Sequence, residues 1–216
     1  MAAAHGAEIS GSTLLARYAG SLCRPSATRD IRNVHLIHHT KEQEQTMTTG
    51  TTVIEHQVRR LLIALPEPYD VARQHYETLV PAIDPAHLQQ LDTWEAVLEQ
   101  VKIDAPHGFM RYATMDMTQT MALSPSHWKA TQYLMGNHTI AERMFRHDPS
   151  AVLHAPLRTL IYADAEGDTK LAVDQPSLLF ASYHNPEIAS VGEELDALLA
   201  ALIDLLDGEV PHQLES

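Results

Sequence analysis

Titratable side chains are dense in one stretch of the chain, residues 128–149. His138, Glu142 and His147 follow one another there at short spacing. Imidazole titrates near neutral pH and a neighbouring carboxylate sets its tautomer, so His138 is a candidate general acid or base. No nucleophile elbow or other catalytic signature accompanies it. Acid or base chemistry is therefore one interpretation of the stretch, and it indicates no particular reaction or cofactor.

Metal binding is an alternative for the same three side chains. A helix would place His138 and Glu142 on one side, with His147 just beyond, and two imidazoles with a carboxylate can hold Zn²⁺ or Fe²⁺. However, Thr139 and Glu142 also have the spacing of a capping box. That box would leave His138 outside the helix and would use Glu142 in capping, so both interpretations stay open.

A third interpretation is recognition of a small anionic or amphipathic molecule. Amides at the start of the helix that begins at Thr139 favour an anion, and Arg111 or Arg158 can supply a forked contact. Most of the eight methionines lie between Met110 and Met144, where they can form an adaptable apolar wall. The predicted ligand-binding residues, in a cleft beside the 137–138 turn, are Arg111, Asn137, His138 and Arg158.

Composition and charge exclude other classes of function. The chain has 216 residues and a formal net charge of -13, without the clustered Lys and Arg that phosphate binding requires. We therefore expect no nucleic-acid partner, and anionic membranes would repel the chain. No apolar run is long enough to span a bilayer. Cys23 is the only cysteine, which excludes an internal disulfide or a Cys-based metal site. A cytoplasmic location is expected.

The two ends of the sequence differ from its middle. Residues 1–50 are rich in Ala, Gly, Ser and Thr without periodicity, which predicts a disordered extension or a mis-assigned start, with Met47 as the alternative beginning. Residues 51–207 are predicted to form a single domain. Residues 208–216 are predicted to be a flexible tail.

The elements of the first half are predicted from apolar spacing. Residues 53–64 fit both a strand and a helix, and we favour a strand because prolines then make a turn into a helix over 69–79. Residues 82–104 predict two short helices, opened by Asp84-Pro85 and by residues 92–95, with Trp94 as a core anchor. The first strand would place three apolar residues and two cations on one face, namely Ile54, Val58, Leu62, His56 and Arg60.

The second half reads as strands followed by helices. Residues 109–123 alternate like a bent, half-buried antiparallel strand, with Arg111 interrupting its apolar face. Residues 131–134 predict a strand before the Gly136-Asn137 turn, and an acidic Gly turn joins 157–163 to 169–173 as a hairpin. A short helix over 177–183 precedes a long one, opened by Asn185-Pro186 and ending near Leu206. The order predicts an α+β fold, a two-layer sandwich in which helices pack on one face of an antiparallel sheet.

These elements resemble a bacterial family of uncharacterised proteins, the domain of unknown function 302 family. The resemblance runs from about Val53 to Leu206 and is carried by a Gly-Asn turn, a short helix ending in Asp-Pro, an Ala-Pro-Leu-Arg entry and the acidic Gly hairpin. It rests on residues 135–146, 148–149, 155–158, 160–167 and 173–176. The resemblance implies a compact two-layer α+β domain, commonly paired as a homodimer, and implies no reaction.

The sequence departs from that family at two places. Many members have a cysteine before the Asn of the turn and another after the Leu-Pro-like entry, where this chain has Gly136 and Leu157. A thiol or thiolate-metal role therefore does not transfer. We expect a dimeric small-ligand-binding domain. The alternatives are an enzyme that uses His138, alone or with Glu142 and His147, and a protein-interaction module that uses the helix over 188–206.

Overall fold

A five-stranded antiparallel sheet forms one layer of the fold. The computed structural model describes residues 50–214. The strand order across the sheet is β1-β5-β4-β3-β2, and every neighbouring pair is antiparallel. The strands are β1 (Arg60–Ala64), β2 (Met110–Asp116), β3 (Ala130–Gly136), β4 (Leu157–Ala163) and β5 (Thr169–Asp174). The β4–β5 hairpin confirms the prediction from the acidic Gly turn.

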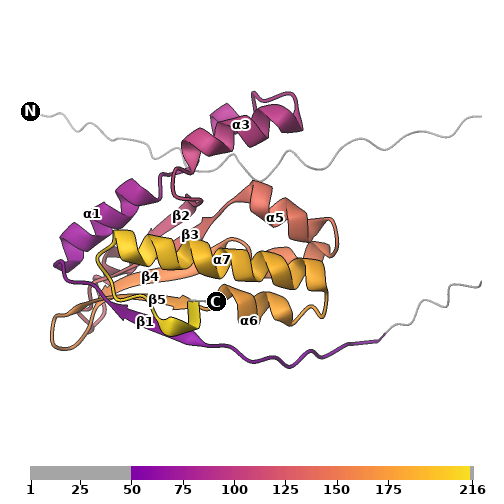
Figure 1. The fold of residues 1–216 in the computed structure, drawn as a ribbon. Helices are drawn as coiled ribbons and strands as arrows, with labels where there is room; N and C mark the ends of the chain where they lie inside the picture. The colour runs from indigo at the N-terminus through magenta and orange to yellow at the C-terminus, as the bar shows by residue number, and fades with distance from the viewer. Residues whose placement is uncertain (1–49, 215–216) are drawn as a thin grey trace, which may run out of the picture. The chain divides into compact units, whose positions relative to one another are not determined.

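Helices cover one face of this sheet, with α1, α6 and α7 lying across it in Figure 1. Asp84 and Asn185 accept hydrogen bonds from the first amides of α2 and α7, so both predicted helix starts are confirmed. The α+β fold class is therefore confirmed. The helices are α1 (Tyr69–Leu79), α2 (Pro85–Leu88), α3 (Trp94–Asp104), α4 (Met117–Thr120), α5 (His138–Phe145), α6 (Pro176–Ala181) and α7 (Pro186–Leu205), with 3-10 turns η1 (Pro149–Leu153) and η2 (His212–Leu214).

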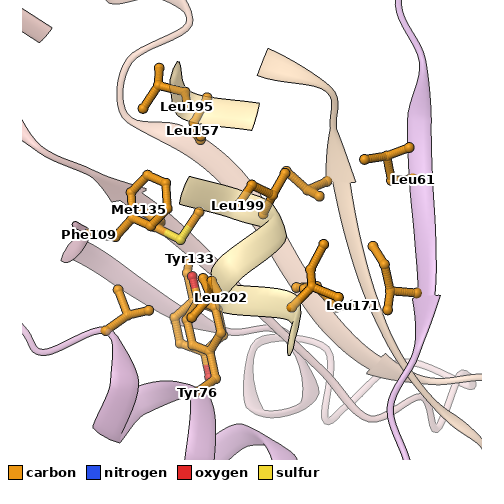
Figure 2. Packing of buried hydrophobic residues seen from close by; sticks show 14 of the residues in the cluster. Leu61, Tyr76, Phe109, Tyr133, Met135, Leu157, Leu171, Leu195, Leu199 and Leu202 are labelled. Carbon is orange, nitrogen blue, oxygen red and sulfur yellow. The ribbon is translucent and has the colours of Figure 1, made fainter. Parts of the chain in front are cut away.

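The main core lies between the sheet and α7. Alternate residues of the strands point to the helices, and Leu195, Leu199 and Leu202 of α7 pack on them, as Figure 2 shows. The apolar stripe of α7 is thus buried within its own domain. The alternative that this stripe recruits a partner protein is therefore not supported by the packing. The strand residues in this core include Leu61, Tyr133, Met135, Leu157, Ile161 and Leu171.

The first strand is shorter than predicted and shows its other face to the core. β1 begins at Arg60, and Leu61 and Ile63 are buried while Leu62 is 59% exposed. Antiparallel pairing with β5 sets this register, because Leu61 lies opposite Val173 on the helix-covered side. The face that carries Leu62 and Arg60, which was predicted as the apolar face of the strand, is therefore the outer face, where the Arg60 guanidinium pairs with Asp174 at 2.9 Å.

Two predictions around α3 and β2 are also wrong. Trp94 is 41% exposed because α3 uses residues nearer its C-terminal end, Val101 and the adjoining Ala105, in a small cluster with Met110. The predicted strand over 109–123 ends at Asp116, where the Asp116 side chain caps α4. The expected bend is confirmed, as a register shift between Arg111 and Ala113.

The ends of the described region complete the domain. Gln213 and Leu214 lie within the segment predicted as a flexible tail, yet Leu214 is buried in the core and the Gln213 carbonyl accepts a hydrogen bond from Gln175. The predictions for residues 1–46 and for the 1–50 extension fall almost wholly outside the described residues. Within residues 50–214, no helix has both the length and the apolar character needed to cross a membrane.

Candidate functional site

Asn137 is the cap of α5, which replaces the predicted capping box. Its side-chain oxygen accepts from the Thr139 amide at 3.0 Å and the Ile140 amide at 3.4 Å, and its Nδ2 donates to the Gly108 carbonyl. The helix therefore begins two residues earlier than predicted, with Asn137 rather than Thr139 as its cap, and Glu142 instead pairs with Arg146. Since every side-chain polar group of Asn137 has a partner, this residue has a structural role in the turn.

His138 is the first residue of α5 and is held by Tyr112. The Tyr112 hydroxyl lies 2.8 Å from Nδ1, whereas Nε2 is buried and has no partner within residues 50–214. Burial lowers the pKa of His138, partly opposed by the Asp104 carboxylate, and burial raises the pKa of Tyr112 to about 12. The imidazole is therefore neutral near pH 7 and can accept or donate a proton. Its role as a ligand-binding or catalytic group stays a prediction.

The alternative metal trio does not assemble in the described part of the chain. Residues 50–214 contain no group of three or more His, Cys, Asp or Glu side chains placed to hold a metal ion. Glu142 is engaged by Arg146, and His147 is exposed beyond the end of α5. His138 and Glu142 lie in α5 and His147 follows the helix, and this arrangement accounts for their spacing in the sequence. The three side chains do not form one coordination sphere.

Arg111 is committed to the end of α1. Its Nε donates to the Val80 carbonyl at 2.7 Å and its Nη1 to the Thr114 hydroxyl at 2.9 Å, and its side chain is only 14% exposed. A further contact reaches the Glu77 carbonyl at 3.4 Å. A guanidinium at the C-terminal carbonyls of a helix satisfies them and complements the helix dipole. Arg111 therefore has little donor capacity left for a ligand.

Arg158 lies on the outer face of the sheet, away from the main core. It is exposed in β4 between buried Leu157 and Thr159, and it makes no side-chain hydrogen bond or ion pair with any residue from 50 to 214. Neighbouring cations are occupied, because Arg59 donates to Gln175 and Arg60 to Asp174. The structure therefore separates Arg158 from His138 and Arg111, and the four predicted ligand residues do not form one site.

Two adjoining hollows share Arg158 and Asp174 in their linings. The sheet-face hollow, of about 610 Å³, is lined by residues of all five strands. They include Arg60, Met115, Gln132, Leu160 and Ala172. The histidine hollow, of about 250 Å³, adds residues from the segment before β1, from η1 and the loop that follows it, and from α6, namely His56, Val58, Leu153, His154, Pro156 and Leu179.

The methionines do not gather into one cleft. Met110, Met135 and Met144 are buried, while Met115 is partly exposed on the outer face and lines the sheet-face hollow. The cavity that Gly136 and Asn137 line beside the 137–138 turn has a volume of about 20 Å³. This volume is too small for the predicted ligand cleft, because it is close to the space of a single water molecule.

His56 and His154 are site residues that sequence reasoning did not bring together. Their ring centroids lie 5.8 Å apart in an edge-on arrangement, and His154 also makes edge contacts with Phe180 and Tyr183. The pKa of His154 is lowered mainly because its ring is partly buried, and to a smaller extent by the neighbouring His56. One sequence signal pointed to this region, since alternation in β4 separates Arg158 from its buried neighbours and assigns it to the outer face.

Comparisons with known proteins give a family and a fold. A search of the curated proteins finds no match. Among solved structures, the chain is similar to an uncharacterised conserved DUF302 protein from Bacillus stearothermophilus, with a TM-score of 0.51 and 14% identity. The similarity covers 68% of this chain and 97% of the other. At this identity, the structural likeness supports the shared fold alone.

The family assignment rests on the sequence. The family model described as "Domain of unknown function DUF302" matches residues 85–206, more than half of the chain. The matched region includes the Asn137 turn, the β4–β5 hairpin and α7. The chain therefore belongs to the DUF302 family, as its turn, hairpin and proline-bounded helices predict.

Proposed function

We propose that this protein binds a small anionic, amphipathic molecule on the outer face of its sheet. Arg158 holds the anionic group, and the sheet-face hollow accepts the apolar part. The supporting observation is that Arg158, which has no partner within residues 50–214, borders both hollows. The proposal retains the predicted class of ligand and moves its site from the 137–138 turn to the outer face.

The charges around Arg158 favour an anion. Among residues 50–214, Asp174 is the only acidic residue in either lining, and Arg60 approaches its two carboxylate oxygens at 2.9 and 3.4 Å. The Arg158 charge is therefore left uncompensated locally, in a chain whose formal net charge is -13. A guanidinium offers a planar fork of donors to an oxyanion. The local positive charge thus favours a ligand that carries a negative charge.

The remaining lining favours an apolar body attached to that anion. Leu160, Ala172 and Met115 contribute aliphatic and thioether surface to the sheet-face hollow, and Gln132 supplies an amide. Met adapts its shape to irregular apolar groups. An alkyl or aryl chain that lies across these side chains would be removed from water on one side, which contributes roughly 25 cal/mol for each Å² buried.

Replacing Arg158 with leucine tests this proposal. Calorimetric titration of wild-type protein with sodium decanoate should show binding, and Arg158→Leu should weaken it by about 10- to 100-fold, because a charge-assisted hydrogen bond contributes about 1.5–3 kcal/mol. Arg143→Leu is the control, since Arg143 pairs with Glu194 on another surface. Decanoate that binds neither protein, or binds Arg158→Leu as tightly as wild type, would contradict the proposal. Decyltrimethylammonium, which has the opposite charge, should not bind.

Self-association is a second candidate for the outer face. Leu62 is 59% exposed on this face, and Met115 adds further exposed apolar surface. Large exposed apolar side chains are typical of interfaces, and here they lie on the two edge strands of one face of the sheet. We propose a homodimer that covers this region, so light scattering should give twice the chain mass and Leu62→Glu should give a monomer. Ile103→Glu, at an exposed aliphatic residue of α3 that lines neither hollow, should stay dimeric. A monomeric wild-type protein would refute it.

A further inference from the structure

We propose that the histidine hollow is a proton-coupled subsite for a tetrahedral oxyanion headgroup, of the sulfate or phosphate monoester class, held by His56, His154 and Arg158. The inference rests on the proposed function, because the headgroup belongs to the same ligand whose apolar part lies in the sheet-face hollow. It adds the chemical class of the anion and a dependence of binding on pH.

Three nitrogen-bearing side chains reach this hollow from separate parts of the chain. His56 comes from the extended segment before β1, His154 directly follows η1, and Arg158 comes from β4. Each can donate hydrogen bonds when the imidazoles are protonated. Donors that arrive from several directions suit a tetrahedral group, whose oxygens also point in several directions. A planar carboxylate has only two oxygens and therefore accepts hydrogen bonds from fewer of these donors.

His154 is fixed in position by aromatic neighbours. Its ring centroid lies 6.2 Å from that of Phe180 and 6.1 Å from that of Tyr183, both at nearly perpendicular angles. The Tyr183 hydroxyl donates to the Ser150 carbonyl at 2.8 Å, which ties this ring to η1. These contacts limit the rotation of His154, so less side-chain entropy is lost when a ligand binds.

The charged and titratable groups around His154 leave room for an anion. His56 faces it from the segment before β1, Arg158 from β4, Asp174 from β5 and Tyr183 from the loop after α6. The one carboxylate among them, Asp174, is already paired with Arg60. Protonation of His154 therefore adds positive charge next to Arg158 and His56 without a free carboxylate to offset it. The negative charge of a bound oxyanion neutralises part of this positive charge.

Proton uptake follows from the environment of His154. Burial and the neighbouring His56 lower its pKa in the unliganded protein, below the ordinary value of about 6.5. A bound anion favours the imidazolium and raises that pKa. Between the two pKa values, binding takes up a proton. The affinity must therefore increase as pH falls through this window.

Octyl sulfate tests the inference, because its headgroup stays singly charged throughout the range and any pH dependence comes from the protein. Calorimetry of the full-length protein should show binding about tenfold tighter at about pH 5.5 than at about pH 8, which corresponds to about 1.4 kcal/mol. Titrations in two buffers of different ionisation enthalpy should show proton uptake. His154→Gln should remove most of the pH dependence, and His127→Gln, at an exposed histidine before β3, should keep it.

The outcomes separate this inference from the proposed function. Equal affinity at both pH values in wild type and His154→Gln, with the affinity still lost in Arg158→Leu, would overturn the headgroup subsite and leave the outer-face site standing. Failure of both octyl sulfate and decanoate to bind would overturn both. If circular dichroism shows that His154→Gln is unfolded, His56→Gln is the replacement variant, because His56 is exposed in an extended segment. It should likewise reduce the pH dependence.

Discussion

Replacing Phe180 with alanine is expected to lower the free energy of unfolding by about 3–5 kcal/mol. Phe180 is fully buried in α6, in the core beside α7. A methyl group added at Gly192 of α7 would approach its Cβ to 3.0 Å. The two helices are therefore already in close contact and cannot move together to fill the space that the ring leaves. The resulting cavity should therefore bring the loss of unfolding free energy into the upper part of the range of about 3–5 kcal/mol.

Urea unfolding of the two proteins, followed by circular dichroism, measures this effect. Phe145→Ala is the matched control, because Phe145 is 49% exposed near the end of α5 and its loss should change stability by less than about 0.5 kcal/mol. If Phe180→Ala and Phe145→Ala lowered the free energy of unfolding by similar amounts, the packing described for α6 and α7 would be contradicted. Phe180→Ala should also weaken the binding of octyl sulfate, because it removes one of the rings that hold His154.

Local sequence signals predicted where the helices and strands lie better than they predicted which face of a strand packs in the core. The starts of α2 and α7 are set by Asp84 and Asn185, whose side chains cap the helices that immediately follow them. β1 has apolar residues on both faces, so its alternation fits either orientation. The outcome depends on pairing with β5, which lies far along the chain, and this pairing places Leu61 rather than Leu62 in the core.

The candidate site was only partly predictable for the same reason. Sequence reasoning selected Arg158 for its chemistry, and the side chain is exposed beside two hollows. It also selected Arg111, whose donors are used by carbonyls at the end of α1, a contact between distant segments. His56 and His154 were not paired by the sequence, because only the close approach of the segment before β1 to η1 brings them together.

Removing the carboxylate of Asp196 is expected to cost about 2–3 kcal/mol of unfolding free energy, because it leaves buried donors without acceptors. Asp196 is 3% exposed in α7, and its two oxygens accept from the Ser177 amide at 2.9 Å and from Gln175 Nε2 at 2.6 Å. Gln175 also donates to the Gln213 carbonyl. One carboxylate therefore joins α7 to the start of α6 and to the end of the described chain.

The comparison that tests this role is Asp196→Ala against Asp204→Ala in the same helix. Asp204 is exposed and accepts no side-chain hydrogen bond within residues 50–214, so its loss should change stability by less than about 0.5 kcal/mol. Amide hydrogen exchange adds a local readout, because the freed Ser177 amide should exchange faster in Asp196→Ala than the loss of global stability alone explains. If Asp196→Ala were as stable as Asp204→Ala, the ordering of α6 and of residues 208–214 would depend on apolar contacts such as Leu214 instead.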